Sequence, residues 1–468
     1  MDNKYNANSI DSVINYALQL KGKTLREACG NSIESHGYTG KGNFGQLLEN
    51  FYFGIERNSR AEPDFLKVGL ELKTSPLKIN RKGEYSSKER LVLGIINYLK
   101  VHNETFETSS FWKKNAHLLL VFYLHDKHKD LLDYFIKIVG SWKYPSQDLL
   151  QIKRDWELIN QKIKEGKAHE LSEGDTFYLG ACTKGSKGGN LRKQPFSHVQ
   201  APQRAYSLKQ KYVNHIIANI TDSETEVYGK IIDELAKVDA SMSIEEVVIL
   251  KFEPFYGKSV LEIAKILGLK INNKAKNYLA KLTNKLITKS ILGIEASKKI
   301  EEFEKGNIEV KTIRLRADNL PKENISFRAF NYNRIINEDW EESGFKDILE
   351  RRYLFIFYQF ENKQLILKKV KFWNMPYLDI IEAKEVWEKT VQIIKQGNIV
   401  KRVDKNGKRF TNFPKKSNHR ISHVRPHASN KYDTYPLPIA DVLTGETKYM
   451  KHCFWLNNNY VKNEIYLK

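Results

Sequence analysis

Cysteine is scarce in this sequence, and the three cysteines, Cys29, Cys182 and Cys453, lie far apart among its 468 residues. Their positions form neither a CxxC pair nor another spacing that is typical of a metal site. A secreted scaffold held by disulfides is therefore excluded. We expect free thiols in a reducing compartment, the cytoplasm.

Long apolar segments are missing as well. The longest apolar runs, residues 118–124 and 353–358, are far shorter than the roughly 20 residues that span a bilayer. The polar N-terminal sequence MDNKYNANSID has none of the features of a signal peptide. We expect no membrane partner, and the two apolar runs predict buried strands.

Acidic residues are in the minority. The chain has 77 Lys and Arg against 56 Asp and Glu, so its formal net charge is +21, and the basic residues are dispersed rather than gathered in a tail. This excess favours a polyanionic partner, and together with the acidic cluster described next it favours nucleic acid. A soluble basic protein from an AT-rich genome, in which lysine is simply common, is the alternative.

A short acidic cluster carries the most specific chemical signal. Asp64 is followed after six residues by Glu71-Leu72-Lys73. On a strand, Glu71 and Lys73 lie on the same side. A turn through residues 67–69 can bring the Asp64 carboxylate beside Glu71.

Such a cluster suits a metal-dependent nuclease. Two carboxylates and the backbone carbonyl of Leu72 are the hard oxygen ligands that Mg²⁺ prefers. The metal would polarise the scissile phosphate and lower the pKa of a bound water. Lys73 could orient that water and stabilise the developing charge. The pattern alone is weak, and a solvated strand with alternating charge is the other interpretation.

An internal repeat sets the architecture. Five short segments recur in the same order at offsets of 231 to 238 residues, which indicates a duplicated domain. The matched pairs are residues 22–27 with 257–262, 71–74 with 309–312, 97–109 with 331–343, the apolar strand near 118 with that near 353, and 156–166 with 387–397.

The repeat predicts two domains of the same kind. We expect a catalytic domain over residues 1–218, a linker that contains a short helix over 219–245, and a second domain over 246–468. Apolar residues at helical spacing predict a helix over 148–166, which ends at a glycine. Each copy should be an α/β sandwich whose small mixed sheet carries the site.

The first copy resembles the MutH family of mismatch-repair endonucleases. The resemblance rests on residues 45–49 (GQLLE), Asp64-Phe65, residues 69–74 (GLELKT), 107–109, 155–157, 178–179 and 208–209. It covers roughly residues 20–215 and recurs weakly over 250–465. Two MutH-like copies in one chain are similar to the Sau-type restriction enzymes that cut GATC. Residues 85–93 (YSSKERLVL) and 166–174 (GKAHELSEG) look especially like that subgroup.

The resemblance implies a restriction-endonuclease-like fold and a set of active-site residues. Asp64, Glu71 and Lys73 match the family's catalytic triad. Glu49 matches a further acidic residue on the helix behind the metal site, although from charge alone it is a solvated helical glutamate. Lys114 matches a further active-site lysine, although the alignment there can slip by a residue or two. An ordinary strand-edge lysine is the alternative.

The family's base-reading loop should follow residues 178–179. The family has Arg-Pro-Lys where this chain has Cys182-Thr183-Lys184, so the resemblance assigns DNA contact to Lys184 and leaves the mode of base contact open. Lys187 lies in a glycine-rich basic stretch that fits a DNA groove or contacts phosphates only. Tyr206 is either a residue beside the same groove or a core aromatic.

The second copy has lost the chemistry in this comparison. Thr283 aligns with Glu49 and Glu302 with Asp64, and no lysine clearly aligns with Lys114. Glu309 and Lys311 remain. Arg425 and His427, in His-Val-Arg-Pro-His, resemble the family's Arg-Pro base-reading loop. This favours DNA binding without cleavage, as a regulatory domain, and a purely structural duplicate is the alternative.

The resemblance implies a Mg²⁺-dependent type II restriction endonuclease that cuts both DNA strands at GATC, before the G. A MutH-like nickase that answers to methylation in mismatch repair is the alternative, but a second DNA-binding copy supplies avidity without a partner. The intact acidic cluster argues against a catalytically dead DNA-binding protein. Dimerisation on DNA and the binding of two sites both stay open.

Overall fold

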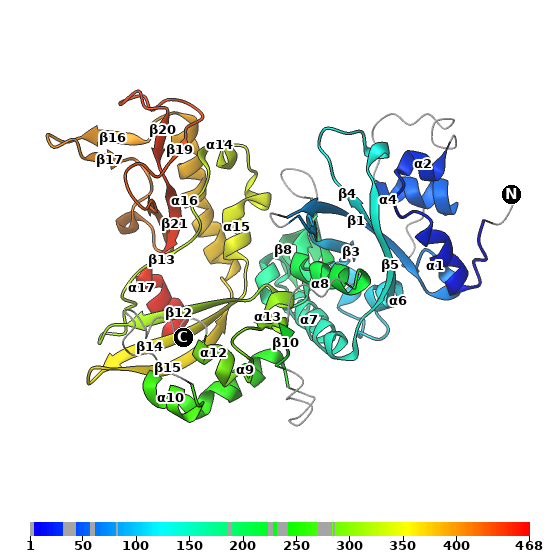
Figure 1. The fold of residues 1–468 in the computed structure, drawn as a ribbon, viewed down its shortest axis with the longest axis horizontal. Coiled ribbons are helices and arrows are strands. Elements are labelled where there is room, and N and C mark those ends of the chain that lie inside the picture. Colours follow the sequence, from blue (N-terminus) through cyan, green and yellow to red (C-terminus); the bar gives the residue numbers. More distant parts are fainter. Residues whose placement is uncertain are drawn as a thin grey trace. The chain divides into compact units, whose positions relative to one another are not determined.

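The computed structural model describes residues 4–30, 44–56, 61–80, 83–184, 190–222, 228–231, 242–269, 283 and 286–468. The chain forms two compact units. The first unit comprises Met1–Tyr228 and Glu301–Asn307, and the second comprises Gly229–Ile300 and Ile308–Lys468 (Figure 1). Most of the predicted linker helix, residues 223–227 and 232–241, lies outside the described residues.

The first unit is built around a mixed sheet of four strands in the order β2-β1-β4-β5. These strands are β1 (Glu71–Ile79), β2 (Tyr85–Ser87), β4 (His117–Leu124) and β5 (Ile136–Lys143). Strand β1 runs parallel to β4, with Glu71 opposite Leu118, whereas β2 and β5 are antiparallel to their neighbours. The predicted apolar strand is β4, and its residues 117–122 are buried because it is central in the sheet.

A second sheet in this unit has the order β3-β9-β6 and is antiparallel. Its strands are β3 (Leu91–Ile95), β6 (Leu179–Thr183) and β9 (Arg204–Leu208), and a hairpin of β7 (Leu191–Gln194) and β8 (Ser197–Pro202) follows β6. The helices of the unit are α1 (Ile10–Leu18), α2 (Leu25–Cys29), α4 (Phe44–Leu47), α5 (Tyr98–Val101), α6 (Ser110–Asn115), α7 (Ser146–Lys164), α8 (Gln210–Ile220) and α13 (Glu301–Gly306), with a π-helical segment η1 (Leu48–Phe53).

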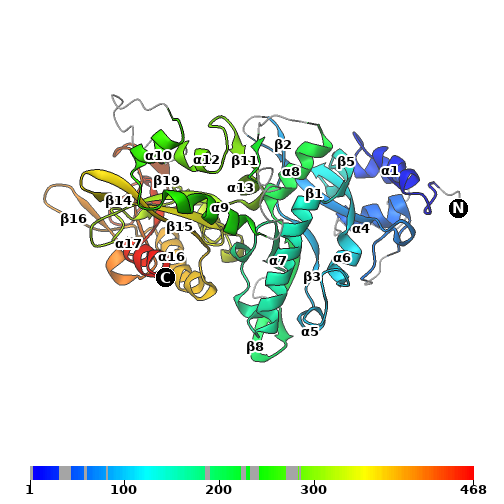
Figure 2. The same cartoon turned by 90° about the horizontal axis from the view of Figure 1, so that it is seen from below.

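Helix α7, drawn at length in Figure 2, is the predicted helix over residues 148–166. It starts after Pro145, and Gly166, at φ +70°, follows its end. The buried Asp155 carboxylate of α7 accepts hydrogen bonds from the backbone N–H groups of residues 177–179, at 2.9, 2.6 and 2.9 Å. This anchors the start of β6 on α7 and so fixes where the predicted base-reading loop leaves the sheet.

The second unit repeats this plan. Its mixed sheet has the order β12-β14-β15, with β12 parallel to β14 and β15 antiparallel, as in β1-β4-β5. Its antiparallel sheet has the order β13-β21-β18. The strands are β12 (Glu309–Leu315), β13 (Ile325–Ser326), β14 (Tyr353–Glu361), β15 (Gln364–Trp373), β18 (Ser422–Pro426) and β21 (His452–Leu456), with hairpins β16 (Val400–Val403) with β17 (Arg409–Thr411) and β19 (Thr434–Pro436) with β20 (Lys448–Met450).

The helices of the second unit are α9 (Ile244–Phe252), α10 (Val260–Ile266), α12 (Ile287–Ile291), α14 (Tyr332–Ile335), α15 (Gly344–Leu349), α16 (Tyr377–Lys395) and α17 (Asn458–Tyr460), with the π-helical segment η11 (Val461–Tyr466). Helix α16 follows Pro376 as α7 follows Pro145. The repeated order of strands and helices confirms the predicted α/β fold in two copies. In the part of the chain that the structure describes, no helix is long and apolar enough to cross a membrane.

Helix α13 departs from the sequence order, because it lies inside the second repeat yet packs in the first unit, beside α8 (Figures 1 and 2). Its Lys305 is buried and contacts both carboxylate oxygens of Asp148, at 2.9 and 3.0 Å, and Glu301 at 2.6 Å. The Tyr212 hydroxyl donates to Asp148 at 2.9 Å.

The residue aligned with Asp64, Glu302, lies in this helix. Glu302 is buried in α13 within the first unit, close enough to Tyr178 for its charge to help raise the pKa of that phenol, after burial. The residue was assigned by its distance along the chain from Glu309, which belongs to the second unit.

Candidate active site

The loop before β1 places Asp64 beside Glu71. After Phe65 the chain makes a 3₁₀ turn (Leu66–Val68) and passes through Gly69 in the left-handed region, at φ +64°. Backbone hydrogen bonds between Phe65 and Leu70 close this loop. The Asp64 carboxylate accepts the Leu72 N–H at 3.1 Å, and the Asp64 N–H donates to Glu71 Oε2 at 3.0 Å. The predicted turn is present, and it needs glycine at its end because other residues are strained at that φ.

Two lysines meet the same carboxylate. Lys73, on the same face of β1, donates from Nζ to Glu71 Oε1 at 2.5 Å. Lys114, in the last turn of α6, has its Nζ 3.4 Å from the same oxygen. The structure thus brings together Asp64, Glu71, Lys73 and Lys114, four of the residues predicted for catalysis. Lys114 is helical, so it is not the strand-edge lysine of the alternative interpretation.

Glu71 is buried, with 1% of its side chain exposed. Burial raises the pKa of the Glu71 carboxyl to about 7, and the charge of Asp64 adds to this effect while Lys73 and Lys114 oppose it. A carboxyl that is held at a raised pKa between a second carboxylate and the protein interior favours the approach of a cation. Its electrostatic environment therefore fits a metal ligand better than a structural ion pair.

The donor set fits a hard divalent cation. Asp64 and Glu71 present carboxylate oxygens, and the strand places the Leu72 carbonyl between Glu71 and Lys73. Among the described residues, no cluster of three or more His, Cys, Asp or Glu side chains could hold a metal. A metal ion here would therefore complete its shell with backbone carbonyl, water or substrate oxygens, as Mg²⁺ commonly does.

Glu49 lies on the π-helical segment η1, where it is half-buried. Its neighbour Leu48 packs in the same core cluster as Leu70 and Leu72, which flank Glu71 along the chain. The segment therefore shares a core with the residues on either side of Glu71. Its role in catalysis stays a prediction.

The residues of the first unit that were predicted to contact DNA differ in exposure, and one of them is not described. Lys184 is exposed at the end of β6, and its N–H donates to the Gln203 carbonyl at 2.8 Å. Lys187 lies outside the described residues. Cys182 is buried in β6, so it cannot take the place of the family's arginine at a DNA surface.

Tyr206 does not face a groove for DNA. It is 4% exposed on β9, where its ring packs 4.9 Å from that of Phe111. The prediction of DNA contact is corrected here, and the core aromatic that sequence reasoning kept as its alternative is the observed state. The side chain points into the sheet–helix interface because inward positions of β9 must be filled.

At the corresponding site of the second unit, the one carboxylate is paired with two cations. Glu309 pairs with Lys311 at 2.6 Å and with Arg351 at 3.4 Å. Although burial opposes it, Lys311 and Arg351 hold the pKa of Glu309 below its usual range. Sequence comparison missed Arg351, because it follows α15 rather than lying in the last turn, as Lys114 does in α6. A single carboxylate with two cations gives little attraction for a metal.

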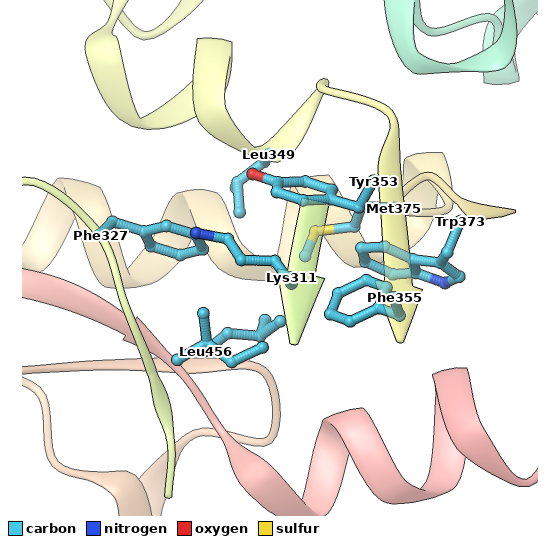
Figure 3. Close-up of a pocket in the computed structure, with 9 residues that line it drawn as sticks. Lys311, Phe327, Leu349, Tyr353, Phe355, Trp373, Met375 and Leu456 are labelled. Carbon is cyan, nitrogen blue, oxygen red and sulfur yellow. The ribbon is translucent and has the colours of Figure 1, made fainter. Parts of the chain in front are cut away.

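Aromatic residues fill the rest of this second site. Figure 3 shows Lys311 extending beside the Phe327 ring, its Nζ 6.0 Å from the ring centroid. The surrounding pocket is lined by Ile325, Leu349, Tyr353, Phe355, Trp373, Met375 and Leu456. Where the first copy has two carboxylates, the second has one carboxylate paired with two cations beside an apolar pocket.

The predicted base-reading residues of the second unit lie at the end of β18. Arg425 and His427 are both exposed. The Arg425 guanidinium lies 4.9 Å from the Trp455 ring centroid, and the His427 ring lies 5.8 Å from it. Sequence reasoning did not single out Trp455, which β21 places across from His423.

Comparison with known proteins agrees with this geometry. A family model described as the DNA mismatch repair enzyme MutH matches residues 53–155 and 292–392, one segment in each copy. The type II restriction enzyme Sau3AI of Staphylococcus aureus is 37% identical over 492 aligned residues, which cover 97% of this chain and 98% of that enzyme. The chain belongs to the MutH family of endonucleases. It is a site-specific deoxyribonuclease of the restriction-enzyme type, with a DNA substrate.

Mismatch-repair members of the MutH family are more distant. The DNA mismatch repair protein MutH of Shewanella woodyi is 29% identical over 179 residues, which is 37% of this chain and 74% of that protein. The MutH protein of Vibrio vulnificus is 25% identical over 191 residues, 39% of this chain and 80% of its own length. Of these three relatives, the restriction enzyme aligns over nearly the whole chain, and membership in this family suggests dependence on a divalent metal.

Proposed function

We propose that this chain is a type II restriction endonuclease that requires Mg²⁺ and hydrolyses both strands of DNA at GATC, before the G. The observation that carries the chemistry is the cluster that Asp64 and Lys73 form around the buried Glu71 carboxylate. The site GATC is supported by the resemblance of residues 85–93 and 166–174 to the Sau-type subgroup. The absence of a disulfide at Cys29, Cys182 and Cys453 is consistent with a cytoplasmic enzyme.

The side chains have separate tasks in this mechanism. Asp64, Glu71 and the Leu72 carbonyl would hold the metal ion, which when bound supplies polarisation of the phosphate and acidification of a water. Lys73, held at 2.5 Å from Glu71, is in position to orient the attacking water and to stabilise charge as it develops on the phosphate. Lys114 adds a second positive charge that favours binding of the phosphate and opposes protonation of Glu71.

We assign the second unit the role of binding DNA without cleaving it. The support is twofold: Glu309 is neutralised by Lys311 and Arg351, and Arg425 is exposed at the position that resembles the base-reading loop. An arginine that faces guanine in the major groove is the commonest specific contact. In this proposal the second unit binds another GATC site and stimulates or tethers the catalytic unit.

Plasmid cleavage tests the activity. With Mg²⁺, linear fragments that map to GATC are expected from the wild type, and none from a GATC-free plasmid. Glu71→Ala should lower the cleavage rate by at least about 10³-fold, because a metal ligand is lost, and Lys73→Ala should do the same through loss of charge stabilisation. Both variants should still bind duplex DNA.

A matched control is Lys67→Ala, which changes an exposed lysine in the loop beside the site. Its rate should stay within a few-fold of the wild type. Full cutting by the Glu71→Ala variant would disprove the metal site. Products that stop at nicked circles would instead support the alternative, a methylation-directed nickase.

A further inference from the structure

Three cations of the second unit lie close together without a carboxylate partner. Arg316 follows β12, Lys416 begins the 3₁₀ turn η10 (Lys416–Asn418), and Arg425 is in β18. In the described part of the chain, none of them forms an ion pair. Burial lowers the pKa of Lys416, and the charges of Arg316 and Arg425 lower it further. A lysine held near two arginines, with no carboxylate paired to it among the described residues, indicates a site for an anion.

Lys416 is held in place by a neutral group. Its Nζ donates to Asn458 Oδ1, so its charge is positioned but not cancelled. Asn458 is buried and fixed in turn, since its N–H donates to Asn324 Oδ1 at 2.9 Å and its amide nitrogen donates to the Pro321 carbonyl at 3.0 Å. The lysine is therefore pre-organised, which lowers the entropy lost when a ligand binds.

A polar cavity of about 400 Å³ lies beside this lysine. Its lining includes Lys416, Ser417, Asn418, His419, Asn457 and Asn463. Glu464, the one carboxylate among the described residues that line it, is paired with Arg420 and Lys468. The cavity thus offers a cation, a hydroxyl and amide donors, a set that suits a phosphate group.

Asn457 links the cavity to the exposed arginine. Its Oδ1 lies 2.5 Å from His423 Nδ1, and the His423 ring lies nearly parallel to that of Trp455, 6.4 Å away. Trp455 carries the Arg425 guanidinium on its ring and donates from Nε1 to the Arg425 carbonyl at 3.4 Å. A chain of side-chain contacts therefore connects the cavity lining to Arg425.

We propose that Lys416 binds a backbone phosphate of DNA in this cavity, and that Trp455 positions Arg425 toward the base edges next to that phosphate. This inference rests on the proposed DNA binding of the second unit and adds the phosphate anchor and the arginine platform. Phosphate contacts set the register of a protein on a duplex, whereas base contacts give specificity. In this proposal Lys416 supplies the phosphate contact and Arg425 supplies the base contact.

Calorimetric titration of the full chain with a short GATC duplex tests the anchor. In EDTA, which prevents cleavage, the wild type should show two binding events per chain. Lys416→Gln should weaken one event several-fold and equally for GATC and unrelated duplexes, and should reduce the salt dependence of that event by about one phosphate contact. Lys265→Gln, which removes an exposed lysine of α10, is the matched control and should change neither event.

Further variants separate the anchor from the proposed function. Lys416→Arg keeps the charge and should retain the second event, which also shows that the position tolerates substitution. If Arg425→Ala abolishes the preference for GATC in one event while Lys416→Gln behaves like Lys265→Gln, the anchor is wrong and the DNA-binding unit stands. If neither variant changes either event, both ideas fail. Stabilisation by inorganic phosphate that needs Lys416, with unchanged DNA binding, would assign the cavity to free phosphate and overturn the proposal.

Discussion

Opposing electrostatic effects act on the carboxyl group of Glu71. Burial and Asp64 raise the pKa of its carboxyl to about 7, whereas Lys73 and Lys114 act against them. Without a metal ion the folded protein therefore carries an unfavourable buried charge above neutral pH. A bound cation would remove this electrostatic penalty, so the burial that disfavours the charged carboxylate also favours metal binding.

The pH dependence of stability follows from this shift. The folded pKa is above the unfolded value of 4.5, so the contribution of Glu71 to stability is fully present below about pH 4.5 and is lost as pH rises through 7. In EDTA, Glu71→Gln should stabilise the protein by up to about 3 kcal/mol at pH 8, and the gain should vanish near pH 4.5. Chemical denaturation at both pH values measures it.

Glu309→Gln is the matched control in the second unit. The pKa of Glu309 is lowered by Lys311 and Arg351, so this change should destabilise the protein at pH 8 instead. A Glu71→Gln gain that is the same at every pH would contradict the assignment of a raised pKa.

At this scale the sequence predicted what depends on short-range geometry. The strand spacing of Glu71 and Lys73 and the turn that returns Asp64 were both derivable, because a few residues determine them. The burial of Tyr206 was not, since the direction of β9 depends on what packs on it. The contact of Arg351 with Glu309 also came from tertiary structure, as no spacing signal marks it.

Among the elements, α13 shows how one short helix can belong to a distant part of the chain. Asp148 and Tyr212 in the first unit match Asp379 and Tyr460 in the second, where Tyr460 donates to Asp379 at 2.6 Å. In the second unit Arg420 supplies the cation, and its guanidinium lies 5.4 Å from the Tyr460 ring. In the first unit the cation is Lys305 of α13.

Removal of the Lys305 charge should therefore be costly. Lys305→Met leaves Asp148 buried without its cation, and the expected loss in the free energy of unfolding is about 3 kcal/mol or more. Lys211→Met is the control, because its pair with Glu304 is exposed and should contribute less than about 1 kcal/mol. Denaturant unfolding of the full chain compares them, and equal effects of the two variants would show that α13 is only loosely attached.

Elements with strong periodicity, such as α7 and β4, were predictable with their bounds nearly right. The packing of helix α13 was not predictable, because residues 301–307 precede β12 within the second repeat and were expected to belong to the second domain. The unit on which this helix packs depends on Asp148, more than 150 residues earlier.

At the scale of the whole molecule, the duplication produced two copies with one fold and different electrostatics. One copy keeps two carboxylates around a buried centre, and the other has one carboxylate balanced by two cations. The same sheet order therefore supports cleavage in one unit and, in our proposal, recognition alone in the other.

Cooperation between two GATC sites tests this division of labour. If the second unit binds a second site, a plasmid with two sites should be cut on the order of tenfold faster than one with a single site. Arg425→Ala should bring that ratio close to one. Addition of a short GATC duplex in trans to the one-site plasmid distinguishes stimulation, which it should restore, from tethering, which it should not. A wild-type ratio of one would remove the regulatory role.

Helix α13 also bears on how such enzymes can be recombined. A natural or engineered exchange of second halves with a breakpoint in residues 229–243 would transfer residues 301–307 together with the new half. The host catalytic unit would then receive a foreign residue where Asp148 needs Lys305. Productive hybrids must keep that lysine with the catalytic half, so the two halves of this chain are expected to diversify as a matched pair rather than as interchangeable modules.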